Sequence, residues 1–116
     1  MGVATRRRIL LVDDDSDVVS TFQMILEMNG FEVEVYTSPI SALSNFRPDE
    51  FGLLILDIRM PVMNGFELFK KIKEIDNRVQ ACFITAYEDY REEFKESFAM
   101  LMKLSILFEN QKQLRI

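Results

Sequence analysis

The sequence predicts an α/β protein built on a doubly wound parallel sheet. Short apolar runs at residues 9–12, 51–56 and 79–84 are the main indication. Continuous apolar runs of this length are typical of strands covered on both faces, as in parallel sheets. Segments with apolar residues at helical spacing lie between them. Strands that alternate with helices form parallel sheets with right-handed crossovers.

The first half of the chain alternates strand, helix, strand and helix. After the run at 9–12, Ser16 is expected to cap a helix that extends through Asn29, and Gly30 ends it. Residues 31–36 form the second predicted strand. Ser38 and Pro39 provide a cap and a first-turn proline for a short helix to residue 46.

The second half continues the alternation. The strand at 51–56 ends in Asp57, a loop covers residues 60–65, and a helix is expected over 66–75. The apolar residues of that helix are expected to face inward: Leu68, Phe69, Ile72 and Ile75. The strand at 79–84 ends at Thr85, and a charged amphipathic helix is expected from Glu88 to about residue 102.

Composition predicts one domain over residues 1–116, because a chain of this length can bury one good core but not two. The net charge of −5 argues against direct nucleic-acid binding, which needs a basic face. No apolar stretch approaches the length of a membrane span, and the N-terminus lacks the apolar block of a signal peptide. The single cysteine, Cys82, lies in an apolar run, so we expect a reduced thiol and a cytoplasmic protein.

Four polar residues follow predicted strands: Asp13, Asp14, Asp57 and Thr85. Because ligands bind at the carboxyl edge of an open α/β sheet, these residues form a candidate site. Neighbouring carboxylates repel one another, and an oxygen-only donor set selects a hard cation such as Mg²⁺ or Mn²⁺. A carboxylate can also act as a nucleophile toward phosphorus. Histidine is absent, so no histidine mechanism operates on this chain.

Each of these residues also has an ordinary structural interpretation. The run from Asp13 to Asp15 could be acid at a helix N-terminus, Asp57 could merely end a strand, and Thr85 could cap the next helix. Polar residues follow three separate strands, and this agreement favours a shared site over three unrelated structural roles.

Three segments resemble the receiver domains of two-component response regulators. Leu10-Leu11-Val12-Asp13-Asp14-Asp15 is similar to their acidic first-strand motif. Residues 54–65, Leu-Ile-Leu-Asp-Ile-Arg-Met-Pro-Val-Met-Asn-Gly, resemble their phosphoacceptor segment, and Phe83-Ile84-Thr85-Ala86 resembles their fourth-strand hydroxyl motif. The resemblance covers residues 8–98. It implies the flavodoxin-like fold of the receiver type, with an altered or truncated fifth strand and fifth helix here.

The resemblance also implies roles for individual residues. Asp57 would be the phosphoacceptor, and it would ligate Mg²⁺ together with Asp14 and the backbone carbonyl of Arg59. Asp13 would act through metal-bound water, and Thr85 would contact the phosphoryl group and switch position. Pro61 and Gly65 would shape the adjacent loop.

The partner implied by the family is a sensor histidine kinase or a phosphotransfer protein, which carries the phosphohistidine. The domain would accept the phosphoryl group and change its binding to a downstream partner that the sequence does not identify. It would assist only its own phosphotransfer and dephosphorylation, and is not otherwise an enzyme. Neither nucleic acid nor a membrane is an expected direct partner.

The tail at 99–116 departs from the family pattern. It has no Lys-Pro pair and no aromatic residue clearly placed as the switch, and Lys103 is not assigned the missing role. Allowed codons for Lys103 through Gln111, read one base out of frame, encode Val-Lys-Tyr-Phe-Ile-Arg-Lys-Pro. One hypothesis is therefore a frameshift just before Lys103. The other is a divergent tail that still forms a strand over 104–108. Reduced helix cover predicts self-association through this region.

Three functions compete at this stage. The first is a working phosphoacceptor, and the second is a phosphorylation-impaired interaction module with the same fold. The third is a Mg²⁺-dependent phosphohydrolase with an aspartate nucleophile. Such enzymes carry a second acid two residues after the nucleophile, where this chain has Arg59, so this function ranks last.

Overall fold

The structure, a computed structural model, describes residues 8–84. Its elements are β1 (Arg8–Val12), α1 (Ser16–Met28), β2 (Glu32–Tyr36), α2 (Pro39–Ser44), β3 (Phe51–Asp57), α3 (Gly65–Ile75) and β4 (Gln80–Ile84). The predicted helix from Glu88, the predicted strand at 104–108 and Thr85 lie outside the described residues. Within residues 8–84 no helix is long and apolar enough to cross a membrane.

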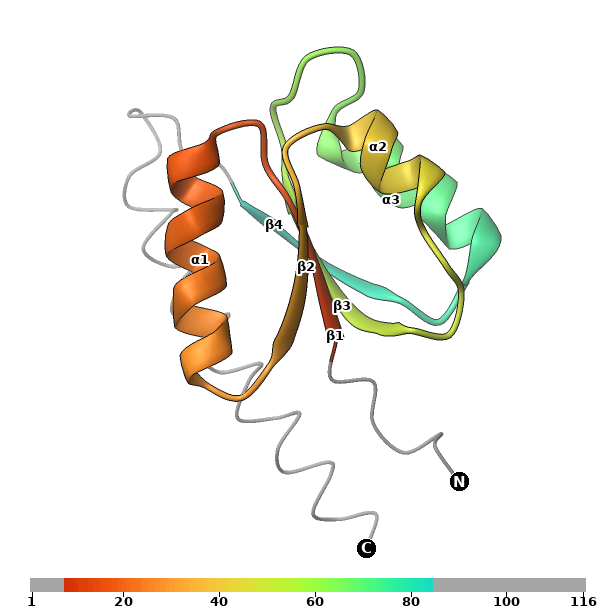
Figure 1. Cartoon of the computed structure of the whole chain (residues 1–116). Helices are drawn as coiled ribbons and strands as arrows, with labels where there is room; N and C mark the ends of the chain where they lie inside the picture. Colours follow the sequence, from red (N-terminus) through yellow and green to blue (C-terminus); the bar gives the residue numbers. More distant parts are fainter. Residues whose placement is uncertain (1–7, 85–116) are drawn as a thin grey trace, which may run out of the picture.

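The four strands form one parallel sheet in the order β2-β1-β3-β4. Helix α1 covers one face of the sheet, and α2 and α3 cover the other (Figure 1). This arrangement confirms the predicted doubly wound α/β fold. Because the strands are parallel, their carboxyl ends meet at one edge, where the β1–α1 and β3–α3 loops also lie (Figure 1).

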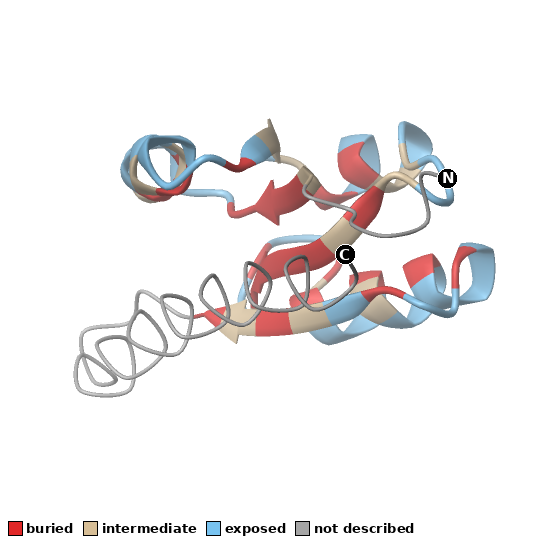
Figure 2. Ribbon diagram, turned by 90° about the horizontal axis from the view of Figure 1, so that it is seen from below, coloured by how far each residue is buried: buried red, intermediate tan, exposed pale blue. Residues whose placement is uncertain are grey.

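The interior consists of two apolar layers, one on each face of the sheet. Strand β3 contributes to both, since Leu53 and Ile55 face α1 whereas Leu54 and Leu56 face α2 and α3. Figure 2 shows buried residues along the strands and exposed residues on the outer sides of the helices. This two-sided burial explains why the β3 segment is an unbroken apolar run.

The start of α1 corrects one prediction. Asp15, not Ser16, is the N-cap, because its carboxylate accepts hydrogen bonds from the N–H groups of Asp17 and Val18. The residue has the extended backbone that a cap requires. The third acid of the run is therefore committed to the helix, which leaves Asp13 and Asp14 for the site.

The end of α3 corrects a second prediction, namely that Ile75 faces inward. Leu68 and Ile72 are fully buried, but Ile75 is 46% exposed. The inward stripe continues at spacing four to Asp76, whose carboxylate accepts the N–H groups of Asp49 (2.9 Å) and Arg78 (3.1 Å). A satisfied buried acid therefore occupies the place that the apolar pattern assigned to Ile75.

Candidate functional site

Asp13 follows β1 directly and is almost completely buried, at 1% exposure. Its N–H donates to the carbonyl of Tyr36, and this hydrogen bond joins the end of β1 to the end of β2. Its Oδ1 accepts the N–H of Asp15 at 2.9 Å, whereas its Oδ2 is buried without a hydrogen-bond partner. A buried carboxylate oxygen without a donor is costly, so this atom is placed for a ligand that the protein itself does not supply.

Asp57 is the last residue of β3 and is 5% exposed. Its Oδ1 accepts the N–H of Arg59 at 3.2 Å. The next residue, Ile58, donates its N–H to the carbonyl of Ile84 at 2.8 Å, which ties the end of β3 to the end of β4. The residue that follows Ile84, Thr85, is outside the described range, so its predicted phosphoryl contact stays a prediction.

Asp13, Asp14 and Asp57 come together at the carboxyl edge. Each offers an oxygen, and these atoms all lie within 4.8 Å of one another. Asp14 is exposed while the other two are buried, so the group is open to solvent on one side. The three acids line a surface pocket. Arg59, whose backbone carbonyl is the fourth predicted ligand, lines the same pocket.

The electrostatics of the group favour a cation. Burial, and then the charge of Asp13, raise the pKa of Asp57 well above its usual range. Burial likewise raises the pKa of Asp13. Both carboxyls therefore resist ionisation when no cation is bound. An all-oxygen donor set with an unpartnered Asp13 oxygen fits a hard divalent ion.

The loop after β3 is shaped by a close approach at Gly65. A Cβ at this position would lie 2.3 Å from the carbonyl oxygen of Asp57, so only glycine fits. The Gly65 N–H also donates to the carbonyl of Ile58 at 3.1 Å. Asn64 then caps α3 in a reciprocal pair with Glu67, so the predicted loop-shaping role of Gly65 has a clear geometric basis.

Sequence reasoning missed some of the pocket wall. Met60, Asn64 and Phe66 also line the pocket. Met60 is buried in the core beneath α2 and α3, whereas Phe66 is 54% exposed. No residue-type signal distinguishes a wall residue from an ordinary loop or helix residue, because these positions are set by the path of the loop.

Residues 9–103 match the response regulator receiver domain family. Among curated relatives, the transcriptional regulator DctD of Rhizobium meliloti is 38% identical over 70% of this chain and 18% of that protein. PrrA of Mycobacterium leprae is 37% identical over 68% of this chain and 34% of that protein. The receiver protein CpdR of Brucella abortus is 37% identical over 70% of this chain and 68% of that protein. The chain thus spans about a third or less of DctD and PrrA.

Solved structures agree. The receiver domain of HemR from Leptospira biflexa is 29% identical, with a TM-score of 0.70 over 87% of this chain and 93% of that one. TrrA of Thermotoga maritima, solved with Mg²⁺ and a beryllium fluoride, is 30% identical, with a TM-score of 0.62 over 73% of this chain and 74% of that one. TrrA in complex with the histidine kinase ThkA is 32% identical, with a TM-score of 0.63 over 72% of each chain.

Proposed function

This chain belongs to the response regulator receiver domain family of two-component systems, and we propose that it takes a phosphoryl group on Asp57 from the phosphohistidine of a partner kinase or phosphotransfer protein. One observation carries the proposal. Three carboxylates reach the carboxyl edge of the sheet with ligand atoms within 4.8 Å, and one buried oxygen of Asp13 has no hydrogen-bond partner.

The chemistry follows from the positions of these groups. A carboxylate oxygen of Asp57 attacks phosphorus, a P–O bond forms, and the P–N bond to the donor imidazole breaks. The imidazole nitrogen takes the bonding electron pair and a proton, and the product on this chain is an acyl phosphate. The Arg59 N–H, at 3.2 Å from Asp57 Oδ1, holds the carboxylate in position.

Asp14, Asp57 and the Arg59 carbonyl would hold Mg²⁺ or Mn²⁺ directly, with Asp13 acting through a water molecule. When bound, the ion neutralises the carboxylates and the charge on the transferring group. The magnesium and beryllium fluoride complex of TrrA supports this assignment by similarity. The complex of TrrA with ThkA supports a histidine kinase as the partner. Thr85, next to Ile84, is proposed as the phosphoryl contact and switch.

The test is intact-mass spectrometry after incubation with acetyl phosphate and Mg²⁺. We expect one added phosphoryl group, lost in Asp57→Asn and in excess chelator. Asp17→Asn is the matched control. Asp17 is an exposed acid in the first turn of α1, close to the site in the sequence, but it does not belong to the group of Asp13, Asp14 and Asp57. An adduct that persists in Asp57→Asn would place the phosphoryl group elsewhere and refute the assignment.

A phosphorylation-impaired interaction module is the second candidate. The observation that favours it is the tail at 99–116, which has no Lys-Pro pair, because the resemblance implies that the lysine of this pair contacts the phosphoryl group. A folded protein that binds Mg²⁺ but gains no mass with acetyl phosphate would support this candidate.

We propose the frameshift as one origin of the altered tail, and the gene sequence tests it directly. Codons for residues 103–111 that encode Val-Lys-Tyr-Phe-Ile-Arg-Lys-Pro in the shifted frame would support it. Codons incompatible with that reading would eliminate it.

A further inference from the structure

The sequence Met-Asn-Gly-Phe-Glu occurs twice in the chain, at residues 28–32 and 63–67. The two copies have different structures. The first copy lies between the end of α1 and the start of β2, whereas the second forms the start of α3. Because the neighbours of Asn29 and Asn64 are identical, a difference in the chemistry of these two asparagines comes from the fold rather than from the residues beside them.

An asparagine that precedes a glycine can lose its side-chain amide in water without an enzyme. The glycine nitrogen gives up its proton and attacks the asparagine Cγ, so a new N–C bond forms. The Cγ–Nδ2 bond breaks, ammonia leaves, and a five-membered succinimide ring remains. Water then opens the ring at either carbonyl, which leaves aspartate or isoaspartate. Glycine favours the attack because it has no side chain and its backbone rotates freely.

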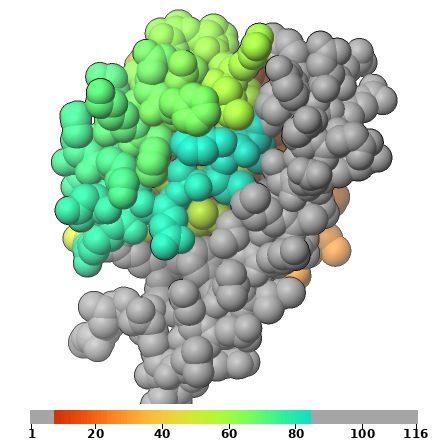
Figure 3. Space-filling model, turned by 180° about the vertical axis from the view of Figure 1, so that it is seen from behind, coloured from red at the N-terminus to blue at the C-terminus, as the bar shows by residue number. Residues whose placement is uncertain are grey.

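At Asn64 the fold holds every atom that this reaction needs. Its Oδ1 accepts the N–H of Glu67 at 2.8 Å, and its own N–H donates to the Glu67 carboxylate at 3.0 Å. The attacking nitrogen belongs to Gly65, which is buried and donates to the carbonyl of Ile58 at 3.1 Å. Figure 3 shows the loop after β3 packed with α3 and β4 on the back of the molecule. The reaction therefore requires this loop and the first turn of α3 to separate from the end of β3.

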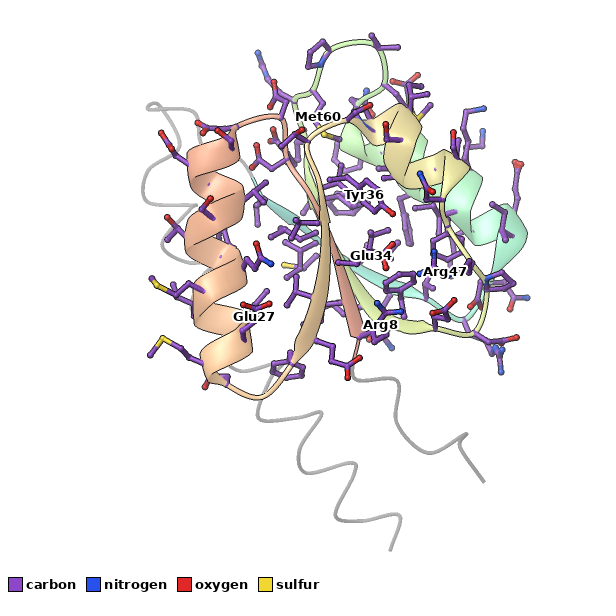
Figure 4. All side chains as sticks on the ribbon, viewed as in Figure 1. Arg8, Glu27, Glu34, Tyr36, Arg47 and Met60 are labelled. Atoms are coloured by element: carbon purple, nitrogen blue, oxygen red, sulfur yellow. The ribbon has the colours of Figure 1, made fainter. Side chains whose placement is uncertain are left out.

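At Asn29 the corresponding atoms are held by hydrogen bonds within the last turn of α1. The Asn29 Nδ2 donates to the carbonyl of Ile25 at 2.8 Å, and the Gly30 N–H donates to the carbonyl of Glu27 at 3.0 Å. Asn29 and Gly30 are both exposed. Figure 4 shows Glu27 at the end of α1 that is far from Met60, a residue of the pocket wall. Because helix ends fray at little cost in free energy, opening of one turn releases both reacting groups.

We propose that Asn29 is a site of spontaneous deamidation in the folded protein and that the fold protects Asn64 from the same reaction. Water is the co-reactant, and the products are ammonia and aspartate or isoaspartate at position 29. The protection matters for the acidic pocket, because Asn64 lines it. A carboxylate at position 64 would add a fourth acid to the group of Asp13, Asp14 and Asp57.

The modification at position 29 is expected to weaken the end of α1. A carboxylate there would lie at the C-terminal end of the helix, where the helix dipole disfavours negative charge. Isoaspartate would also lengthen the main chain immediately before Gly30, whose φ of 88° forms the turn, and Phe31, which is buried. We therefore expect the deamidated chain to unfold at a lower denaturant concentration, with its acidic group unchanged at the other end of α1.

The test is peptide mapping by mass spectrometry on the full chain after incubation in mildly alkaline buffer. Chelator is present and a phosphodonor is absent, so the outcome is independent of phosphorylation. Electron-transfer fragmentation locates the modified residue and separates aspartate from isoaspartate. In guanidinium chloride the two asparagines should react at similar rates, because their neighbours match. In the native protein we expect Asn29 to react about tenfold faster than Asn64, or more.

A matched pair of substitutions tests the cause of the protection. Glu67→Ala removes the carboxylate that accepts the Asn64 N–H, and it should speed deamidation of Asn64 about threefold or more. Glu32→Ala makes the same change in the first copy, where Glu32 pairs with Arg8, and should leave the rate at Asn29 unchanged.

Three results would overturn the proposal. The first is a native ratio of the Asn29 rate to the Asn64 rate that is no larger than the ratio in denaturant. The second is an Asn29 that stays intact in the native protein while the denatured chain reacts. The third is a Glu67→Ala variant in which Asn64 reacts as slowly as in the wild type, which would refute the capping box as the source of protection.

Discussion

Neutralising Asp57 is expected to stabilise the protein when no divalent cation is present. Two unit charges 4.8 Å apart repel by about 3 kcal/mol at an effective dielectric constant of about 20, and Asp57 has two acidic neighbours within that distance. Burial, then the charge of Asp13 and side-chain hydrogen bonds with the two neighbouring acids, raise the pKa of Asp57 from 3.8 to about 8. At about 1.4 kcal/mol for each pKa unit, the penalty at neutral pH cannot exceed about 4 kcal/mol. Solvent on the exposed Asp14 side of the group screens part of this repulsion. We therefore expect Asp57→Asn to raise the free energy of unfolding by about 1–3 kcal/mol.

The sign of the pH dependence follows from the same pKa. Well below pH 3.8 the carboxyl is protonated in both the native and the unfolded chain, and the substitution changes little. The native penalty then grows with pH and levels off above about 8. Denaturant unfolding in chelator, at about pH 5, 7 and 8.5, should therefore show a gain from Asp57→Asn that increases with pH. A loss of stability, or a gain of equal size at each pH, would refute the electrostatic reasoning.

Magnesium should remove most or all of the stability advantage of Asp57→Asn over the wild type. An ion that binds only the native state, present at a hundred times its Kd, stabilises by about 2.7 kcal/mol. The wild type should gain this stability, and Asp57→Asn should gain much less because one ligand has lost its charge. Asp17→Asn, which retains the three-acid group, should respond like the wild type. An equal response in Asp57→Asn would show that the ion binds elsewhere.

Substitutions at three further positions test the loop beside the site. Gly65→Ala should lower the free energy of unfolding by about 2 kcal/mol or more, measured by denaturation, because its Cβ would overlap the Asp57 carbonyl. Val62 is 87% exposed and has a φ of 74°, in a tight turn closed by the hydrogen bond from the Met63 N–H to the Pro61 carbonyl. Val62→Gly should raise the free energy of unfolding by about 1 kcal/mol, because glycine adopts this φ without strain. Asn64→Ala should lower it by about 1 kcal/mol through loss of the capping box with Glu67, and Asn64→Asp should restore most of the loss.

The strands were predictable because their physical signal is strong. Leu53 to Leu56 are all buried, alternately on the two faces of the sheet, so no polar residue interrupts the run. The convergence of Asp13, Asp14 and Asp57 follows from parallel strands alone, since each acid stands at or just after a carboxyl end. The fold and the acidic group thus depend on local composition and on one topological rule.

Features that depend on contacts between distant segments were not predictable. The ion pairs of Arg8 with Glu34 and Glu50 join residues 26 and 42 positions apart. The buried Asp76 replaced Ile75 on the inner stripe of α3 because the loop before β3 presents the Asp49 N–H to it. The positive φ of Val62 was also not predictable, because β-branched residues strongly prefer negative φ values.

The geometry also separates two requirements that a receiver normally satisfies together. In the proposed function a cation would be held at the ends of β1 and β3, and both lie within the part of the chain that the structure describes. Transmission of the phosphorylated state would depend on groups that follow β4, namely Thr85 and the family's Lys-Pro pair, which residues 99–116 lack. Magnesium binding and phosphorylation on Asp57 can therefore persist while the response to them is lost. The expected sign of that separation is a chain that gains one phosphoryl group on Asp57 while the amide exchange pattern of residues 8–84 outside the acidic pocket stays the same as in the unphosphorylated chain.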